Sequence, residues 1–298
     1  MKKTPFLILF SLLLTLSGGC AAQKEPAQVA ATTLPVYEFT SRLCENTPIT
    51  VTRLVTEEVS CLHDYSLNVR QVKAAEAADV IVISGAGLEE FLDDLLDNKD
   101  VIDASEDIEL ICPEEGHNHT HEEHGHDHEG HHHDRDPHIW LSPLHARDMA
   151  FNIWKGLCEQ YPDHAEVFTE NLHGLRAELD ELYFYGWAQL ETLSCRELIT
   201  FHDGFAYLAQ AFDLHILEAV EEESGSEASA KELIHLIEEV EHHDLPAIFT
   251  EKSGSVSAAG IIARETGCGS FQLDMAMAGN SYFEAMYHNI DTIREALG

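Results

Sequence analysis

The feature that most constrains the fold is the stretch Asp163–Thr192, which has almost no helix-breaking residues. Apolar or small side chains recur in it at steps of three and four, namely Phe168, Leu172, Leu175, Leu179, Leu182, Gly186 and Leu190. This spacing predicts one helix about 45 Å long at about 1.5 Å per residue. A coiled-coil dimer would have the same spacing. Because globular patterns lie on both sides, we favour a single helix that packs across two domains of a monomer.

Alternating strand and helix patterns flank the long stretch. Before it, we expect strands over Pro48–Leu54, Asp79–Ser84, Val101–Asp103 and Ile108–Cys112, and helices over Asn68–Ala78 and Leu88–Leu96. After it, we expect strands over Leu198–Phe201, His215–Val220 and Ala247–Thr250, and helices over Ser229–His242 and Ala258–Thr266. This alternation predicts an α/β protein with two lobes built on parallel sheets, one over 32–162 and the other over 193–298, joined by a linking helix over 163–192.

The N-terminus has the pattern of an export signal. Lys2 and Lys3 precede an apolar run, and small residues then precede Cys20. We expect a signal peptide over 1–19, lipidation at Cys20 and a tether over 20–31, which would anchor the protein outside the cytoplasm of a bacterial cell. An ordinary secreted protein is the alternative. The pairing of the other cysteines stays open, between free thiols and one disulfide, for Cys44, Cys61, Cys112, Cys158, Cys195 and Cys268.

The net charge and the histidine content indicate that the protein binds cations. With 17 basic and 54 acidic residues the net charge is −37, which argues against nucleic acid as a partner. Nine histidines lie in a polar tract over 117–133: His117, His119, His121, His124, His126, His128, His131, His132 and His133. The tract has no apolar residue and predicts a loop that binds Zn²⁺ with low affinity. A solvated acidic insert without a role is the alternative.

Four short motifs stand where strands of the predicted sheets should end. They are LHDY with His63, DPHIWLSP with His138, TFHDGF with His202, and QLD with Asp274. In open α/β sheets, ligands bind outside the carboxyl ends of the strands, so these positions have a reason to converge. A lone histidine beside a strand is more often structural than a ligand. The four motifs taken together favour a binding site.

The motifs also carry a family resemblance. DPHIWLSP, FHDGFAYLAQAFDL and ADVIVISGAGLEEFLDDL resemble the metal-binding lipoproteins of bacterial ABC transporters for zinc and manganese, and the resemblance runs from about Thr33 to Leu297. It implies two α/β lobes bridged by one long α-helix, with the metal in the interlobe cleft. It further implies His63, His138, His202 and Asp274 as metal ligands. Glu251 also matches a family position, where it would contact a ligand or have a structural role. Asp203, beside His202, could act as a base or orient that histidine.

The ligand set indicates which metal and which activity to expect. Three imidazoles and one carboxylate suit tetrahedral Zn²⁺, whereas Mn²⁺ prefers more oxygen ligands. A histidine at the position of His202 resembles the zinc-type members. We therefore expect a solute-binding protein that captures Zn²⁺ and delivers it to an ABC-type metal permease. An enzyme is not expected, because a catalytic zinc usually keeps an open position and no HExxH motif occurs. The alternatives are a manganese carrier of the same family and a zinc-storage or adhesion lipoprotein.

Overall fold

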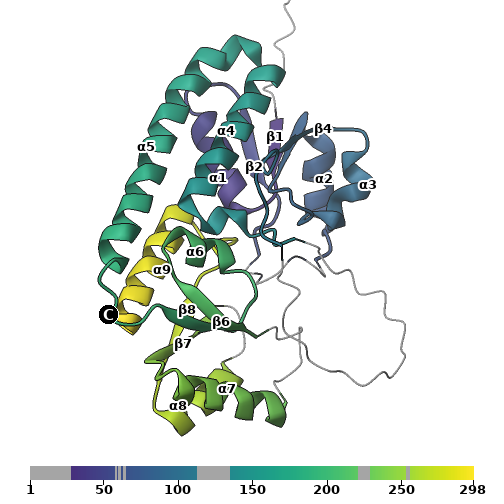
Figure 1. Cartoon of the computed structure of the whole chain (residues 1–298). Helices are drawn as coiled ribbons and strands as arrows, with labels where there is room; N and C mark the ends of the chain where they lie inside the picture. Colours follow the sequence, from purple (N-terminus) through teal and green to yellow (C-terminus); the bar gives the residue numbers. More distant parts are fainter. Residues whose placement is uncertain are drawn as a thin grey trace, which may run out of the picture.

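A computed structural model describes residues 28–57, 59, 62, 65–112, 135–220, 229–252 and 256–298 (Figure 1). The first lobe has a parallel sheet in the order β2-β1-β3-β4. Its strands are β1 (Gln28–Ala31), β2 (Thr50–Arg53), β3 (Val80–Ile83) and β4 (Asp100–Asp103). Its helices are α1 (Leu34–Leu43), α2 (Val69–Ala77), α3 (Asp93–Leu96) and α4 (Pro143–Gln160), with single turns η1 (Glu90–Leu92) and η2 (Ile139–Leu141).

The second lobe repeats the plan with a parallel sheet in the order β6-β5-β7-β8. Its strands are β5 (Glu197–Thr200), β6 (His215–Ala219), β7 (Ala247–Glu251) and β8 (Gly269–Leu273). Its helices are α6 (Ala206–Ala211), α7 (Ala230–His242), α8 (Ser257–Thr266) and α9 (Tyr282–Leu297). The predicted fold class, two α/β lobes with parallel sheets joined by a long helix, is confirmed.

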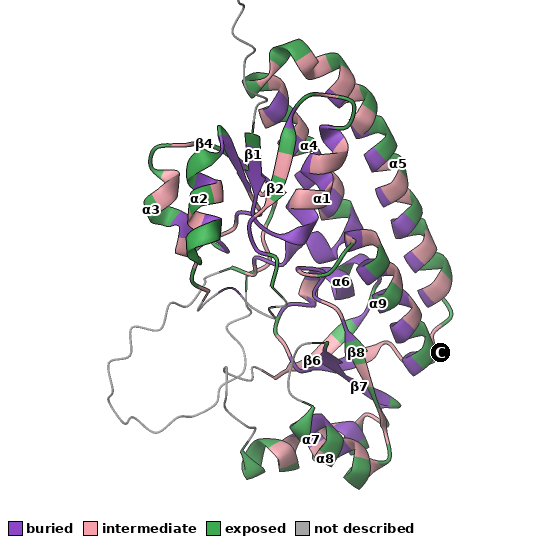
Figure 2. Cartoon of the chain, turned by 180° about the vertical axis from the view of Figure 1, so that it is seen from behind, coloured by how far each residue is buried: buried purple, intermediate pink, exposed green. Residues whose placement is uncertain are grey.

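The inner strands β3 and β7 are buried on both faces, because their residues point alternately to opposite sides and helices cover both sides. In β3, Val80 and Val82 belong to the large core with α1 and α4, whereas Ile81 packs with α2 and the turn η1. In β7, Phe249 joins the same large core and Ile248 packs under α7 and α8. Figure 2 shows the helices around the sheets with exposed residues on their outer faces.

The linking helix α5 (Ala165–Leu190) runs along both lobes, as Figure 1 shows. It follows the turn η3 (Pro162–His164), and the residues that the spacing predicted to be buried are all buried. Phe168 and the buried leucines of α5 belong to one continuous core that also contains side chains from α1 and α4 of the first lobe and from α6 and α9 of the second. The lobes therefore share a core instead of being joined by an exposed linker.

The structure changes three of the expected boundaries. The tether expected over 20–31 overlaps β1, because Val29, Ala30 and Ala31 are buried between β2 and β3. The strand expected over Ile108–Cys112 is wrong, since that segment leaves the sheet and the N–H of Ile111 donates to Tyr207 Oη at 2.9 Å. The helix expected over Leu88–Leu96 is reduced to η1 and α3.

Two further observations concern the membrane and the cysteines. Within the described ranges, no helix combines the length and the apolar character needed to cross a bilayer.

The five cysteines in the described ranges are free thiols: Cys44, Cys112, Cys158, Cys195 and Cys268. Cys20 and Cys61 lie outside the described residues, so the lipidation expected at Cys20 is not addressed by the structure.

Candidate metal-binding site

His138 is held in one orientation at the start of η2. The carboxylate of Asp136 accepts from the His138 backbone N–H at 2.9 Å and lies 2.8 Å from ring Nδ1. The histidine is 3% exposed, so this contact is shielded from water. A carboxylate at Nδ1 favours the tautomer with the proton on Nδ1, which leaves the lone pair of Nε2 for a metal ion.

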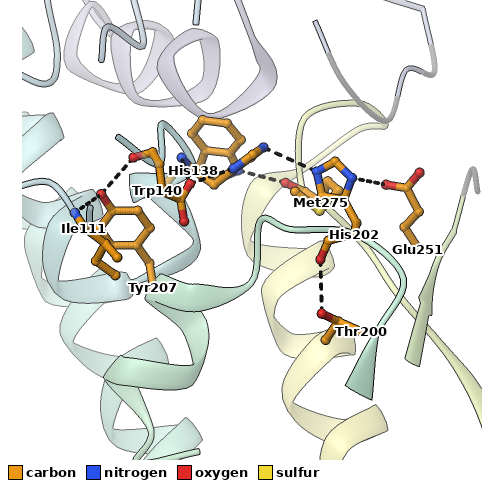
Figure 3. Close-up of polar contacts among 9 residues, drawn as sticks. Ile111, His138, Trp140, Thr200, His202, Tyr207, Glu251 and Met275 are labelled. Atoms are coloured by element: carbon orange, nitrogen blue, oxygen red, sulfur yellow. Dashed lines mark hydrogen bonds and ion pairs between the residues drawn. The ribbon is translucent and has the colours of Figure 1, made fainter. Parts of the chain in front are cut away.

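Buried hydrogen bonds connect the His138 segment to the second lobe (Figure 3). Trp140 Nε1 donates to the carbonyl of Met275 at 2.8 Å, and Tyr282 Oη donates to the carbonyl of Trp140 at 2.8 Å. Tyr207 Oη donates to the carbonyl of Asp136 at 2.9 Å. Burial raises the pKa of Tyr207 to about 12, so its hydroxyl stays protonated and remains a donor. The position of His138 therefore depends on groups from both lobes.

His202 approaches from the second lobe, just after β5. Its Nδ1 lies 3.6 Å from Glu251 Oε2 at the end of β7, and its Nε2 lies 3.5 Å from His138 Nε2. Gly204 leaves room for this ring, since a Cβ there would lie 2.8 Å from His202 Cδ2 and 2.7 Å from the methyl of Met275. Figure 3 shows the imidazoles of His138 and His202 pointing towards one another, with Glu251 on the other side of His202.

The separation of the two Nε2 atoms matches what a zinc ion requires. With Zn–N bonds of about 2.0–2.1 Å and a tetrahedral angle, two ligand nitrogens stand roughly 3.4 Å apart. The observed distance is 3.5 Å. A carboxylate behind each Nδ1 is also the usual arrangement behind a zinc-bound histidine. The pair therefore offers half of a tetrahedral nitrogen site.

Asp274, expected as a ligand, has other contacts. It follows β8, its Oδ2 lies 3.2 Å from Lys252 Nζ, and its Oδ1 accepts from the backbone N–H of Ala276 at 2.8 Å. Across the described ranges, no three histidine, cysteine, aspartate or glutamate side chains gather closely enough to hold a metal. The structure thus brings His138 and His202 together and leaves Asp274 outside that pair.

The remaining expected residues fall into two groups. His63 and all nine histidines of the tract over 117–133 lie outside the described residues. Glu251 is the carboxylate at Nδ1 of His202, whereas Asp203, expected in a similar role, has an exposed side chain. Asp136 was not among the ligands or supporting residues expected from the sequence. Its place two residues before a candidate ligand was the one available sign of its contact with His138.

Comparison with known proteins identifies the family. The model of the ZnuA family, described as "Zinc-uptake complex component A periplasmic", matches residues 29–296. The chain belongs to this family. Members of the ZnuA family are named for uptake of an ion and not for a chemical reaction, in agreement with the expectation that the chain is not an enzyme.

Individual members of the ZnuA family extend the comparison. The "Zinc-binding lipoprotein AdcA" of Streptococcus pneumoniae is 29% identical over 99% of this chain, and the chain spans 61% of the AdcA length. The "High-affinity zinc uptake system protein ZnuA" of Bacillus subtilis is 27% identical over 94% of this chain and 90% of that protein. A crystal structure of ZnuA superposes with a TM-score of 0.76 at 26% identity, covering 92% of this chain and 100% of that one.

Proposed function

We propose that this protein captures Zn²⁺ outside the cytoplasm, between its two lobes, and delivers it to an ABC-type metal permease. The observation that carries the proposal is the pair His138 and His202, whose Nε2 atoms come from different lobes and lie 3.5 Å apart. Zinc is the cargo of such a protein and not a resident cofactor. The names of the relatives, a zinc-binding lipoprotein and a zinc uptake protein, support the same cargo.

We propose His138, His202, His63 and Asp274 as the ligands. The carboxylates of Asp136 and Glu251 lie 2.8 Å and 3.6 Å from Nδ1 of His138 and His202, so their charge favours a proton on each Nδ1 and leaves both Nε2 lone pairs for the ion. Three neutral imidazoles and one carboxylate would leave a zinc complex with a single net positive charge. A set dominated by nitrogen also favours Zn²⁺ over Mn²⁺, whose preferred ligands are oxygens.

Metal identification tests the cargo directly. We expect purified protein to contain zinc and not manganese in elemental mass spectrometry, and to bind one zinc ion tightly in competition with a chromophoric chelator. His138→Ala and His202→Ala should each weaken tight binding by roughly 10-fold or more, because a four-ligand site loses a quarter of its donors. His242→Ala, on the distant helix α7, is the matched control. Unchanged affinity in both site variants would refute the proposed site.

Attachment of the protein to the membrane is a separate proposal. We propose that Cys20 carries a lipid that holds the protein at the membrane beside the permease. In cells fed labelled fatty acid, wild type should incorporate the label and enter the membrane fraction, while Cys20→Ser should be released. Cys112→Ser, at an exposed thiol, should behave as wild type. Label on the Cys20→Ser protein would contradict the assignment.

A further inference from the structure

Two consecutive residues of opposite charge at the end of β7 each contact a different candidate ligand of the second lobe. Glu251 Oε2 lies 3.6 Å from Nδ1 of His202, and Lys252 Nζ lies 3.2 Å from Oδ2 of Asp274. The first contact supports a metal-binding role, because it orients an imidazole. The second places a cation on the carboxylate that a metal ion would need.

The backbone of Asp274 is held by two hydrogen bonds to the side chain of Asn289 in α9. Asn289 is 0% exposed, its Oδ1 accepts from the Asp274 N–H at 2.7 Å, and its Nδ2 donates to the Asp274 carbonyl at 2.7 Å. The N–H of Ala276 donates to Asp274 Oδ1 at 2.8 Å. These contacts leave Oδ2 as the oxygen whose partner is Lys252, a side chain that is 56% exposed. Lys252 can therefore leave without disturbing the buried contacts of Asp274.

Asp274 also adjoins the histidine pair through the residue that follows it. The carbonyl of Met275 accepts from Trp140 Nε1, two residues after His138. The methyl of Met275 and the ring of His202 both border Gly204, at 2.7 Å and 2.8 Å from the Cβ that an alanine would have there. Asp274 is thus connected to the histidine pair through Met275, the next residue in the chain.

We propose that Lys252 is an internal counter-ion for Asp274, which a zinc ion must displace when it binds. The inference rests on the proposed function, since it assigns Asp274 to the zinc site. The ammonium group holds Oδ2 in the metal-free protein, and its charge opposes a divalent ion nearby. Lys252 therefore lowers zinc affinity, and it forms its ion pair with Asp274 again when the ion leaves for the permease. It is a positioning residue that acts through Asp274 and does not bind the ion.

The test measures zinc affinity by chelator competition in four proteins. Lys252→Gln should bind zinc roughly 5-fold more tightly than wild type, which is the size of effect expected for one unit charge about 4 Å away in a largely solvated setting. Lys252→Arg keeps the charge and should restore wild-type affinity. Lys231→Gln, on the exposed side of α7, removes one charge elsewhere and should leave affinity unchanged.

A double variant separates action through Asp274 from a general charge effect. In an Asp274→Asn background, Lys252→Gln should no longer tighten zinc binding. A gain that persists there, or no gain in the single variant, would overturn the proposal. Neither result would affect the proposed function, which is tested separately by the metal content of the wild-type protein and by the His138 and His202 variants.

Discussion

At the residue scale, the site depends on small details around two imidazoles. Side-chain type decides which residues can bind a metal, but their orientation depends on neighbours such as Asp136, which contacts Nδ1 of His138 while Nε2 faces His202. Gly204 has a comparable effect on His202, because it contributes space and no side chain. Both effects come from residues that bind no metal themselves.

Gly204→Ala should lower zinc affinity roughly 10-fold while the protein remains folded. The new Cβ would stand 2.7 Å from the methyl of Met275 and 3.0 Å from His202 Nε2, so the imidazole must shift from its position opposite His138. Chelator competition measures the affinity, and circular dichroism checks the fold. Gly260→Ala in α8, where a Cβ meets no atom within 4 Å, is the control. Wild-type affinity in Gly204→Ala would show that the ring tolerates displacement.

Glu89 should make stability dependent on pH. Its carboxylate accepts from Thr32 Oγ1 at 2.7 Å, Ser84 N–H at 2.7 Å and Gly85 N–H at 3.0 Å. Burial raises the pKa of Glu89 to about 7, although these donors oppose the shift. The folded protein then holds this proton more tightly than the unfolded chain, in which the carboxyl has its ordinary pKa of 4.5. The resulting stabilisation is complete below pH 4.5 and is lost as pH rises through about 7.

Urea denaturation of wild type and Glu89→Gln, both freed of metal, measures this dependence. The difference in unfolding free energy between the two proteins should shift against wild type by up to about 3 kcal/mol between about pH 4.5 and about pH 8. Glutamine does not titrate, so the comparison isolates the carboxyl group. A difference that is constant over this range would contradict the assigned titration.

At the element scale, α5 joins the lobes by close packing along its whole length. Gly186 lies where the ring of Phe212, which follows α6, meets the helix, and a Cβ at this position would overlap that ring. Tyr183, one turn earlier, stacks on the same ring with centroids 6.1 Å apart. The glycine in the predicted spacing of α5 is therefore a contact point with the second lobe.

Gly186→Ala should destabilise the protein by about 1–3 kcal/mol, because the second lobe must move away from α5 to admit the methyl group. Gly174→Ala is a control within the same helix, since its Cβ would meet no atom within 4 Å. That change should be neutral or stabilise by up to about 1 kcal/mol through helix propensity. Thermal and urea unfolding of both variants provide the comparison, and equal stability changes would contradict the packing argument.

At the scale of the whole molecule, one core extends through both lobes. It includes Val82 of β3, Leu182 of α5 and Phe249 of β7. Close-packed interiors resist deformation, so large opening between the lobes would expose apolar surface. Zinc exchange in such a protein is expected to rely on side chains and small lobe movements. The exposed Lys252 side chain fits that expectation.

Deletion of the histidine tract over 117–133 should leave one tightly bound zinc ion and remove several weakly bound ones. Imidazoles in a polar loop must lose conformational entropy to bind an ion, so their sites should be weaker than the site between the lobes. Native mass spectrometry with increasing zinc counts both classes of ion. A glycine-serine segment of equal length serves as the control for loop length. Loss of the tightly bound ion on deletion would place the main site in the tract.

Much of the architecture could be predicted from local patterns. The spacing of Leu172, Leu175 and Leu179 predicted α5, and the apolar run ending at Ile83 predicted β3. The Ser229 cap predicted the start of α7, where a capping box with Glu232 occurs. β1 was not predicted, because its two alanines have little strand signal and it is stabilised by pairing with β2 and β3.

The sequence by itself determined the long helix α5, the helices α2, α7 and α8, most strands and the residue types suited to zinc, because these depend on neighbours only a few positions apart. Tertiary structure alone decided which groups meet. His138 and His202 are 64 positions apart and come within 3.5 Å, while Asp274 pairs with Lys252, 22 positions away. Such contacts depend on how two sheets pack around one helix, and no local periodicity encodes that distance.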